Sequence, residues 1–197
     1  MAMELLTLIN PDIYTNSSYN RGRIYHINVI DGPGPAGNGH IDKMWGSTRP
    51  GTADFLRFAS RYFRTISVWS AGVYRYVHAI CDSIFPIGIR PTIIFTSEDC
   101  IFGQNGSITK PLSKLWPRLP DAGPHNTLVI DDRSDTFIRN IDNGIHIPPY
   151  APRIDQIFNP ESILPIIQKW LMQPEVLSAS DIRWVRKDIF SNSNGTE

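Results

Sequence analysis

Short apolar runs alternate with amphipathic segments along most of this chain, and this alternation most constrains its fold. The runs have the length of buried strands, and the segments between them repeat apolar residues every three or four positions, as helices do. Helices between short strands indicate an α/β protein in which helices cover both faces of a central parallel sheet. The predicted strands span residues 4–9, 23–30, 41–45, 65–69, 92–96, 127–130 and 144–147.

Four helices are predicted between and after these strands, at residues 52–63, 72–85, 161–172 and 174–190. Thr52 follows Pro50-Gly51 and is expected to be the N-cap of the first helix. Pro165 is expected in the first turn or two of the third helix, where a residue without an N–H group is tolerated. The segment "NVIDGPGPAGNGHIDKMW" predicts two strands joined by a Gly- and Pro-rich loop.

Composition and length exclude several classes of protein. Lys+Arg and Asp+Glu number 19 each, so the net charge is zero and no basic surface for nucleic acid or an anionic membrane is indicated. The 197 residues suit one domain, predicted here at residues 1–173, with a C-terminal helix and tail at 174–197. Cys81 and Cys100 lack metal-ligand spacing, which favours a reducing compartment.

The sequence also carries no membrane or export signal. No apolar stretch reaches membrane-spanning length, and the N-terminus lacks the features of a signal peptide. The expected location is therefore cytoplasmic or nuclear, or inside a host cell after delivery by another route. Oligomeric state has no signature in the sequence.

Polar residues follow three of the predicted strands at the point where each strand ends. Asn10-Pro11-Asp12 follow the first strand, Ser70 follows residues 65–69, and Asp131-Asp132 follow residues 127–130. The carboxyl ends of parallel strands share one edge of a sheet, where ligands bind. Two adjacent buried carboxylates need a cation or hydrogen-bond donors to stay ionised, and their hard oxygen atoms suit Mg²⁺. Alone, the Asp-Asp pair fits a helix N-cap equally well.

The order of four segments carries more information than any one of them. "STRPGTADFL", "ISVWSAGVYRYV", "SEDCIFGQNGSITKPLSKL" and "LVIDDRSDTF" together resemble the haloacid-dehalogenase (HAD) superfamily, and most closely its TFIIF-associated and small CTD phosphatases. The likeness covers about residues 5–172, and the superfamily's magnesium-dependent phosphotyrosine phosphatases share much of the layout. It implies a HAD-like Rossmannoid three-layer sandwich with a central parallel sheet, a small β-hairpin insertion and no large cap.

The resemblance also assigns roles to the strand-end residues. It implies a Ser/Thr or Tyr phosphoprotein phosphatase, whose partners are phosphorylated proteins or peptides. Position 10 would be the nucleophile that forms an aspartyl-phosphate, and Asp12 would protonate the leaving oxygen. Arg75 and Arg133 are expected to be solvated or on a helix surface, with a second phosphate contact as the alternative for each. The phosphate-binding set would be Ser70, Ala71 and Lys110, and the magnesium-binding set Asn10, Asp12, Asp131 and Asp132.

Asn10 departs from the pattern that the resemblance implies. The expected motif is Asp-x-Asp-x-Thr or Val, whereas this chain reads Asn-Pro-Asp-Ile-Tyr, with Thr15 one place late. A carboxamide oxygen is a poor nucleophile, so turnover is expected to be very slow or absent. An amide still ligates a cation, and losing one negative charge reduces repulsion of the phosphate, so binding is expected to survive.

Three explanations of Asn10 follow. In the first, Asn10 is a natural change that leaves a non-catalytic binding or scaffolding module. In the second, it is an introduced Asp-to-Asn substitution that traps the substrate. In the third, the nucleophile is Asp31 and not residue 10. Asp31 ends "RIYHINVID" but is followed by Gly32 and has no acid two positions later, which favours Asn10. The otherwise complete polar set favours a phosphatase whose nucleophile has been replaced.

Overall fold

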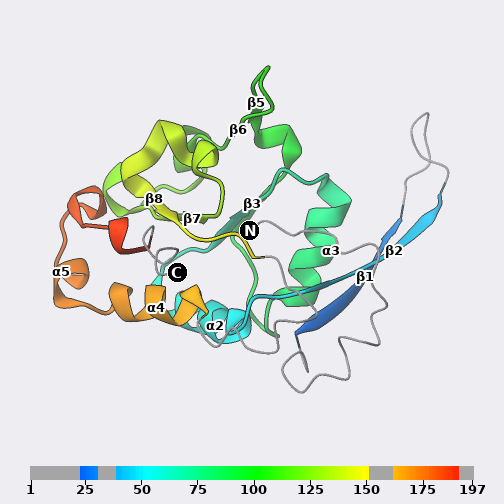
Figure 1. Ribbon diagram of the computed structural model, residues 1–197, viewed down its shortest axis with the longest axis horizontal. Coiled ribbons are helices and arrows are strands. Elements are labelled where there is room, and N and C mark those ends of the chain that lie inside the picture. Colours follow the sequence, from blue (N-terminus) through cyan, green and yellow to red (C-terminus); the bar gives the residue numbers. More distant parts are fainter. Residues whose placement is uncertain (1–22, 31–38, 151–161, 191–197) are drawn as a thin grey trace, which may run out of the picture.

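The computed structural model describes residues 23–30, 39–150 and 162–190 of the chain (Figure 1). The predicted strand at residues 4–9, together with Asn10, Asp12 and Asp31, lies outside the described residues. In the described part, helices and short strands mix along the chain, as the alternation of the sequence predicted. No helix in this part is long and apolar enough to cross a lipid bilayer.

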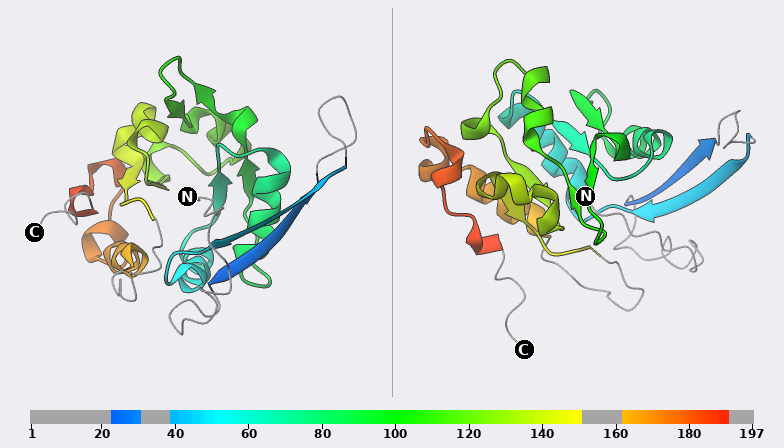
Figure 2. Two further views of the ribbon diagram at one scale, coloured as in Figure 1. Left: turned by 45° about the vertical axis from the view of Figure 1, so that its right-hand side comes forward. Right: turned by 90° about the horizontal axis from the view of Figure 1, so that it is seen from above.

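Strands β1 (Ile24–Ile30) and β2 (Ile41–Ser47) form an antiparallel hairpin. Its register pairs Ile24 with Ser47 and Ile30 with Ile41, which confirms the predicted strand pair. The hairpin extends away from the rest of the protein in both orientations (Figures 1 and 2). It is anchored where Ile27 is buried in a core cluster with Val77 and Ile80 of helix α3 (Tyr74–Ile84).

Two pairs of parallel strands carry the polar strand ends. Strand β3 (Ser67–Trp69) pairs with β4 (Ile93–Phe95), and β7 (Val129–Asp131) pairs with β8 (Gly144–His146). Among the described residues these are separate two-stranded ladders, so the predicted single central sheet is not formed by them alone. Ser70 follows β3 directly, and Asp131 and Asp132 stand at the end of β7.

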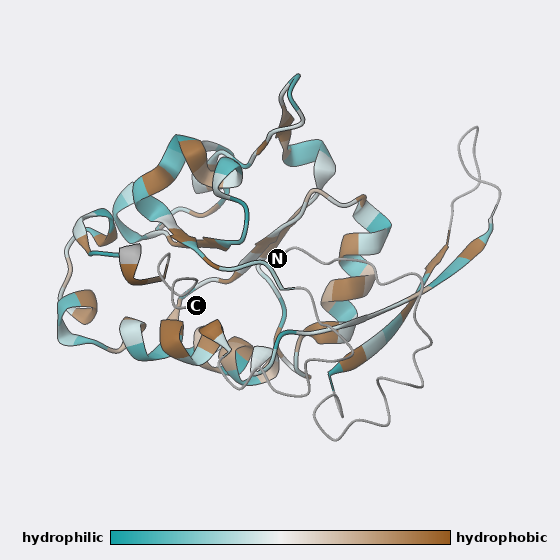
Figure 3. Cartoon of the chain, viewed as in Figure 1, coloured by the Kyte–Doolittle hydropathy of each residue, from teal (hydrophilic) through white to brown (hydrophobic). Residues whose placement is uncertain are grey.

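Helices α2 (Thr52–Tyr62), α3 and α4 (Ile163–Leu171) alternate hydrophobic and hydrophilic bands and bury one side (Figure 3). The predicted N-cap of α2 is wrong by one residue. Gly51 holds that position with φ 77°, a left-handed conformation that glycine adopts without strain, and the Thr52 hydroxyl donates to the Arg49 carbonyl oxygen at 2.8 Å. Pro165 is the third residue of α4, in the predicted first turn.

The single helix predicted for residues 174–190 is also wrong. Helix α5 (Pro174–Leu177) has four residues, and two 3₁₀ turns follow, η6 (Ile182–Trp184) and η7 (Asp188–Phe190). Polar side chains end the helix because they bond to nearby main chain. Ser178 Oγ donates to the Pro174 carbonyl oxygen at 2.7 Å, and Asp181 Oδ1 accepts from the Arg183 amide at 2.9 Å. Helix α5 buries Val176, and the two turns bury Ile182 and Phe190, in the core cluster of α4.

The segment between β4 and β8 is built from turns. Strands β5 (Ile101–Phe102) and β6 (Ile108–Thr109) form a short antiparallel hairpin. Five 3₁₀ segments surround it: η1 (Ser97–Asp99), η2 (Leu112–Lys114), η3 (Trp116–Arg118), η4 (Pro124–Asn126) and η5 (Ser134–Asn143). Their apolar residues bury a third core cluster around Phe95, Leu112, Leu115 and Leu119.

Candidate active site

A cavity of about 430 Å³ lies where the parallel strands end. Its walls come from the β1–β2 hairpin, the turn before α3, strand β6 and the end of β7. A larger cavity of about 580 Å³ is lined wholly by residues 170–189, so none of the strand-end polar groups reaches it. The structure thus brings together around the smaller cavity every predicted site residue of the described part: Ser70, Ala71, Lys110, Asp131 and Asp132.

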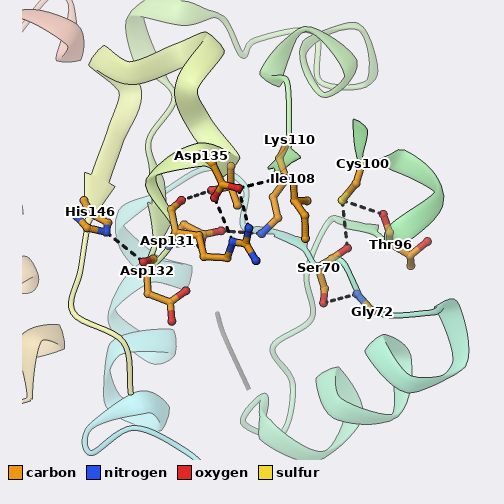
Figure 4. A network of polar contacts seen from close by, with 12 residues as sticks. Ser70, Gly72, Thr96, Cys100, Ile108, Lys110, Asp131, Asp132, Asp135 and His146 are labelled. Carbon is orange, nitrogen blue, oxygen red and sulfur yellow. Dashed lines mark hydrogen bonds and ion pairs between the residues drawn. The ribbon is translucent and has the colours of Figure 1, made fainter. Parts of the chain in front are cut away.

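Lys110 and Asp131 form a buried ion pair at the base of this cavity (Figure 4). Lys110 Nζ lies 2.6 Å from Asp131 Oδ2, and the Lys110 amide donates to the Thr136 carbonyl oxygen at 2.7 Å. Burial acts to raise the pKa of Asp131. The Lys110 ammonium and the Arg133 amide, 3.0 Å from Oδ1, act in the opposite direction and favour the ionised carboxylate. Asp131 is therefore ionised and its charge is compensated.

The carboxylate of Asp132, unlike that of Asp131, accepts no hydrogen bond from the described residues. Both of its carboxylate oxygens are buried and have no hydrogen-bond partner in the described part of the chain (Figure 4). Arg49 Nη2 stays 3.9 Å from Oδ2, and His146 Nε2 reaches only the main-chain oxygen, at 3.1 Å. Burial, and then the charge of Asp131, raise the pKa of Asp132. A buried carboxylate whose only compensation among the described residues is one guanidinium at 3.9 Å is unfavourable, so this side chain fits a site that receives a further cation.

Arg49 forms a long ion pair with Asp132, at 3.9 Å, but no hydrogen bond to it. Its Nη2 donates to the Pro148 carbonyl oxygen at 2.7 Å, and its guanidinium lies 5.3 Å from the centre of the Tyr150 ring. Burial lowers the pKa of Arg49, and the charge of Asp132 acts against that shift. Sequence reasoning used Arg49 only as part of a motif and gave it no place at the site. A basic residue in front of the first predicted helix was the available signal.

The turn from Ser70 to Gly72 forms the wall opposite β7. The Ser70 amide donates to the Phe95 carbonyl oxygen at 3.0 Å, and Ser70 Oγ accepts from the Gly72 amide at 3.1 Å. The hydroxyl proton of Ser70 is thus left for another acceptor. A Cβ atom on Gly72 would lie 2.9 Å from Tyr76 Cδ1, so only glycine fits without movement. Behind this turn, burial raises the pKa of the Cys100 thiol, which makes it unreactive.

Magnesium requires few protein ligands, because it keeps several water molecules and binds substrate phosphate. The described residues contain no group of three or more His, Cys, Asp or Glu side chains that could hold a metal ion. Asp131 is engaged with Lys110, which leaves Asp132 as the carboxylate with unpaired oxygens. One carboxylate with free oxygens is compatible with the small number of protein ligands that Mg²⁺ requires. The other predicted ligands, Asn10 and Asp12, lie outside the described residues.

Several residues at the cavity were not assigned to it from the sequence. Val29, Asp42 and Met44 of the hairpin line it, and nothing in the local sequence indicates this, because the hairpin reaches the cavity only through tertiary packing. Of the two further arginine candidates, Arg133 lines the cavity. Arg75 instead donates to the Ile30 carbonyl oxygen at 2.5 Å.

The fold and the charged strand ends define a class, the HAD-type α/β phosphatases. Residues 12–175 match the family described as NLI interacting factor-like phosphatase. The chain belongs to this family, which confirms the resemblance to the CTD phosphatase branch. The match begins two residues after Asn10, so it does not bear on that position.

A curated relative supports the same branch. A segment of 86 residues is 29% identical to a ubiquitin-like domain-containing CTD phosphatase of Arabidopsis thaliana. The aligned segment covers 43% of this chain and 25% of that protein. The chain therefore spans about a quarter of the length of this relative.

Proposed function

We propose that this chain carries the site of a magnesium-dependent phosphoprotein phosphatase, and that Asn10 makes it hold a phosphorylated side chain with little or no turnover. One observation carries the proposal. Ser70, Lys110, Asp131 and Asp132 surround one cavity, and the Asp132 carboxylate is buried there without a hydrogen-bond partner among the described residues. The phosphatase descriptions of the family and of the similar Arabidopsis protein support it.

Each of these side chains has a distinct task in the proposal. The Ser70 hydroxyl donates its free proton to a phosphate oxygen, beside the main chain of Ala71. The Lys110 ammonium offsets phosphate charge, and Asp131 keeps that ammonium ionised and in place. Asp132 holds Mg²⁺, which when bound neutralises part of the phosphoryl charge.

Position 10 decides whether phosphate is only held or also transferred. For residue 10 to reach the phosphorus atom, the strand predicted at residues 4–9 must end at this cavity, as part of one central parallel sheet. An Asp there would attack phosphorus and form an aspartyl-phosphate, while Asp12 would protonate the leaving oxygen. Asn10 has no anionic oxygen for that attack, and its neutral amide repels the dianion less.

The experiment compares the unmodified chain with Asn10→Asp, using p-nitrophenyl phosphate with and without Mg²⁺. Asn10→Asp is expected to raise the turnover by about a thousandfold or more, because removing a nucleophile costs at least that much. The Asn10→Asp/Asp12→Ala double variant is expected to lose most of the gain. Asp31→Ala in either chain is expected to change nothing.

Three results would contradict this proposal. An inactive Asn10→Asp variant that also fails to bind beryllofluoride with Mg²⁺ would show that the cavity is not a phosphoryl site. Activity of the unmodified chain that disappears in Asp31→Ala would move the nucleophile to Asp31. Full activity without Mg²⁺ would remove the metal from the mechanism.

A non-catalytic binding module is the second candidate function, and Asn10 itself favours it. In that case the unmodified chain binds phosphopeptides, but Asn10→Asp hydrolyses none of them. A panel of phosphoserine, phosphothreonine and phosphotyrosine peptides separates the two functions. It also decides between Ser/Thr and Tyr as the substrate residue.

A further inference from the structure

The cavity has opposite charges on two of its walls. Asp42 lies on β2 of the hairpin, and Arg133 follows β7. In Figure 1 the hairpin runs past α3 and extends away from the end of β7. The turn at Ser70, which precedes α3, lines the cavity between them. A peptide that crosses the site thus meets the carboxylate of Asp42 on the hairpin and the guanidinium of Arg133 beyond β7.

Arg133 is held in a fixed orientation. Its Nε and Nη2 atoms lie 3.1 and 2.7 Å from the two carboxylate oxygens of Asp135. Asp135 Oδ2 also accepts from the Ile108 amide at 2.9 Å, which ties this pair to β6. Arg133 Nη1 makes no hydrogen bond to any described residue, so two N–H donors remain for a ligand carboxylate or phosphate.

Asp42 is the counterpart on the hairpin. Its side chain is 57% exposed, and its one ion pair within the described ranges is to His40 Nε2, at 3.5 Å. The carboxylate is therefore accessible to a Lys or Arg side chain of a ligand. Val29, its partner in the hairpin register, lines the same cavity with Met44 and Tyr76, so apolar surface lies beside the acidic group.

We propose that Asp42 and Arg133 select phosphopeptides by the order of their charges. The preferred peptide has a basic residue on the hairpin side of the phosphorylated residue and an acidic residue on the Arg133 side. This inference rests on the proposed function, because the phosphate at Ser70 and Lys110 sets the register of the peptide. Reversing the charge order would place like charges together on both walls.

The test uses two phosphoserine peptides of equal composition and opposite order. One has Glu before and Lys after the phosphoserine, and the other has the reverse order. Binding to the unmodified chain with Mg²⁺ is measured by fluorescence polarisation. One order is expected to bind about five- to tenfold more tightly at low salt, since each exposed pair contributes up to about fivefold. The difference is expected to shrink at high ionic strength.

A charge exchange provides the decisive variant. Asp42→Lys/Arg133→Glu leaves the net charge unchanged and is expected to invert the preference. The matched control is Glu98→Lys/Arg139→Glu, which makes the same exchange at two exposed positions outside the cavity lining and is expected to keep the original preference. Equal binding of both peptides, or a preference that survives the exchange at Asp42 and Arg133, would overturn the inference.

Unphosphorylated versions of both peptides separate this inference from the proposed function. Phosphate-dependent binding without an order preference would overturn the charge selection and leave the phosphoryl site standing. An order preference that ignores the phosphate would overturn both, because the phosphate is what sets the register of the peptide. If neither phosphopeptide binds, both proposals fail.

Discussion

The base and the rim of the cavity each contain an ion pair of nearly the same length, in very different surroundings. At the base, Lys110 Nζ lies 2.6 Å from Asp131 and the two side chains are 10% and 5% exposed. At the rim, Arg133 Nη2 lies 2.7 Å from Asp135 and the side chains are 48% and 29% exposed. Water screens the rim pair, whereas the base pair has lost its hydration. Burial, and not distance, is therefore expected to set what each pair contributes.

The largest effect is expected for removal of one partner at the base. Lys110→Ala leaves Asp131 buried and uncompensated, so we expect a loss of about 3–5 kcal/mol in the free energy of unfolding. Arg133→Ala at the rim is expected to lose at most about 1 kcal/mol. Both are measured by urea unfolding. The double variant Lys110→Ala/Asp131→Ala is expected to recover part of the lost stability, because no unpaired charge remains. Equal losses of stability in Lys110→Ala and Arg133→Ala would refute the comparison.

The second effect concerns Asp132, the base carboxylate that accepts no hydrogen bond from the described residues. Asp132→Asn removes an unsatisfied buried charge, so we expect a stability gain of about 1–2 kcal/mol without Mg²⁺. The unmodified chain is expected to gain about 2.7 kcal/mol from Mg²⁺ at 100 times the dissociation constant, and the variant very little. Thermal unfolding with and without Mg²⁺ measures both. Asp135→Asn at the rim is the control and should still be stabilised by Mg²⁺. If Mg²⁺ stabilises Asp132→Asn as much as the unmodified chain, Asp132 is not a ligand of the metal.

A third effect tests the turn between base and rim. Gly72→Ala places a Cβ atom 2.9 Å from Tyr76 Cδ1 and 3.2 Å from Val77 Cγ2, so we expect a loss of about 1–3 kcal/mol in the free energy of unfolding. In the Asn10→Asp background, which supplies the carboxylate that beryllofluoride requires, the displaced turn should also weaken binding of beryllofluoride, measured by calorimetry with Mg²⁺. Ser70→Ala removes the hydroxyl together with the hydrogen bond from the Gly72 amide, so it should weaken that binding and lower the free energy of unfolding by about 0.5–1.5 kcal/mol. Normal binding by both variants would exclude this turn from the phosphoryl site.

The smallest effect is the pH dependence of the rim pair. Hydrogen bonds from Arg133 lower the pKa of Asp135 from 3.8 to about 2 in the folded protein. A carboxyl with a lowered pKa stabilises the fold above its unfolded pKa and loses that contribution as pH falls toward the folded value. Asp135→Asn should therefore be less stable than the unmodified chain at pH 7, by at most about 1 kcal/mol, with a smaller difference at pH 3. A difference that stays constant between these pH values would show that the charge of Asp135 is not involved.

Much of the base could be predicted from the sequence, and almost none of the rim. Ser70, Lys110, Asp131 and Asp132 were found because each stands just after an apolar strand or in an ordered motif. Asp42 lies inside a hairpin strand, where a polar residue reads as an ordinary solvent-facing position. Its place at the cavity depends on how the hairpin packs on α3, which local periodicity does not encode.

Errors within the elements have a similar origin. The periodicity of residues 174–190 fits a helix, but Ser178 and Asp181 form competing bonds to the main chain, and burial of Phe190 favours two compact turns. At the start of α2, Thr52 has the side chain of an N-cap, yet Gly51 can adopt the left-handed conformation that the chain requires there. In both places, contacts with other residues or the required backbone geometry outweighed the intrinsic conformational preference of the residue.

The sequence by itself determined the α/β pattern, the strand ends and the family, because these depend on neighbouring residues and on motif order. Only the tertiary structure decided which of two adjacent aspartates forms a close, hydrogen-bonded ion pair. Lys110 and Asp131 are 21 residues apart and meet because β6 packs beside η5, whereas Asp132, one position further, faces the cavity without a hydrogen bond from the described residues. Two identical side chains thus acquire opposite electrostatic environments, because the direction in which each points is set by packing.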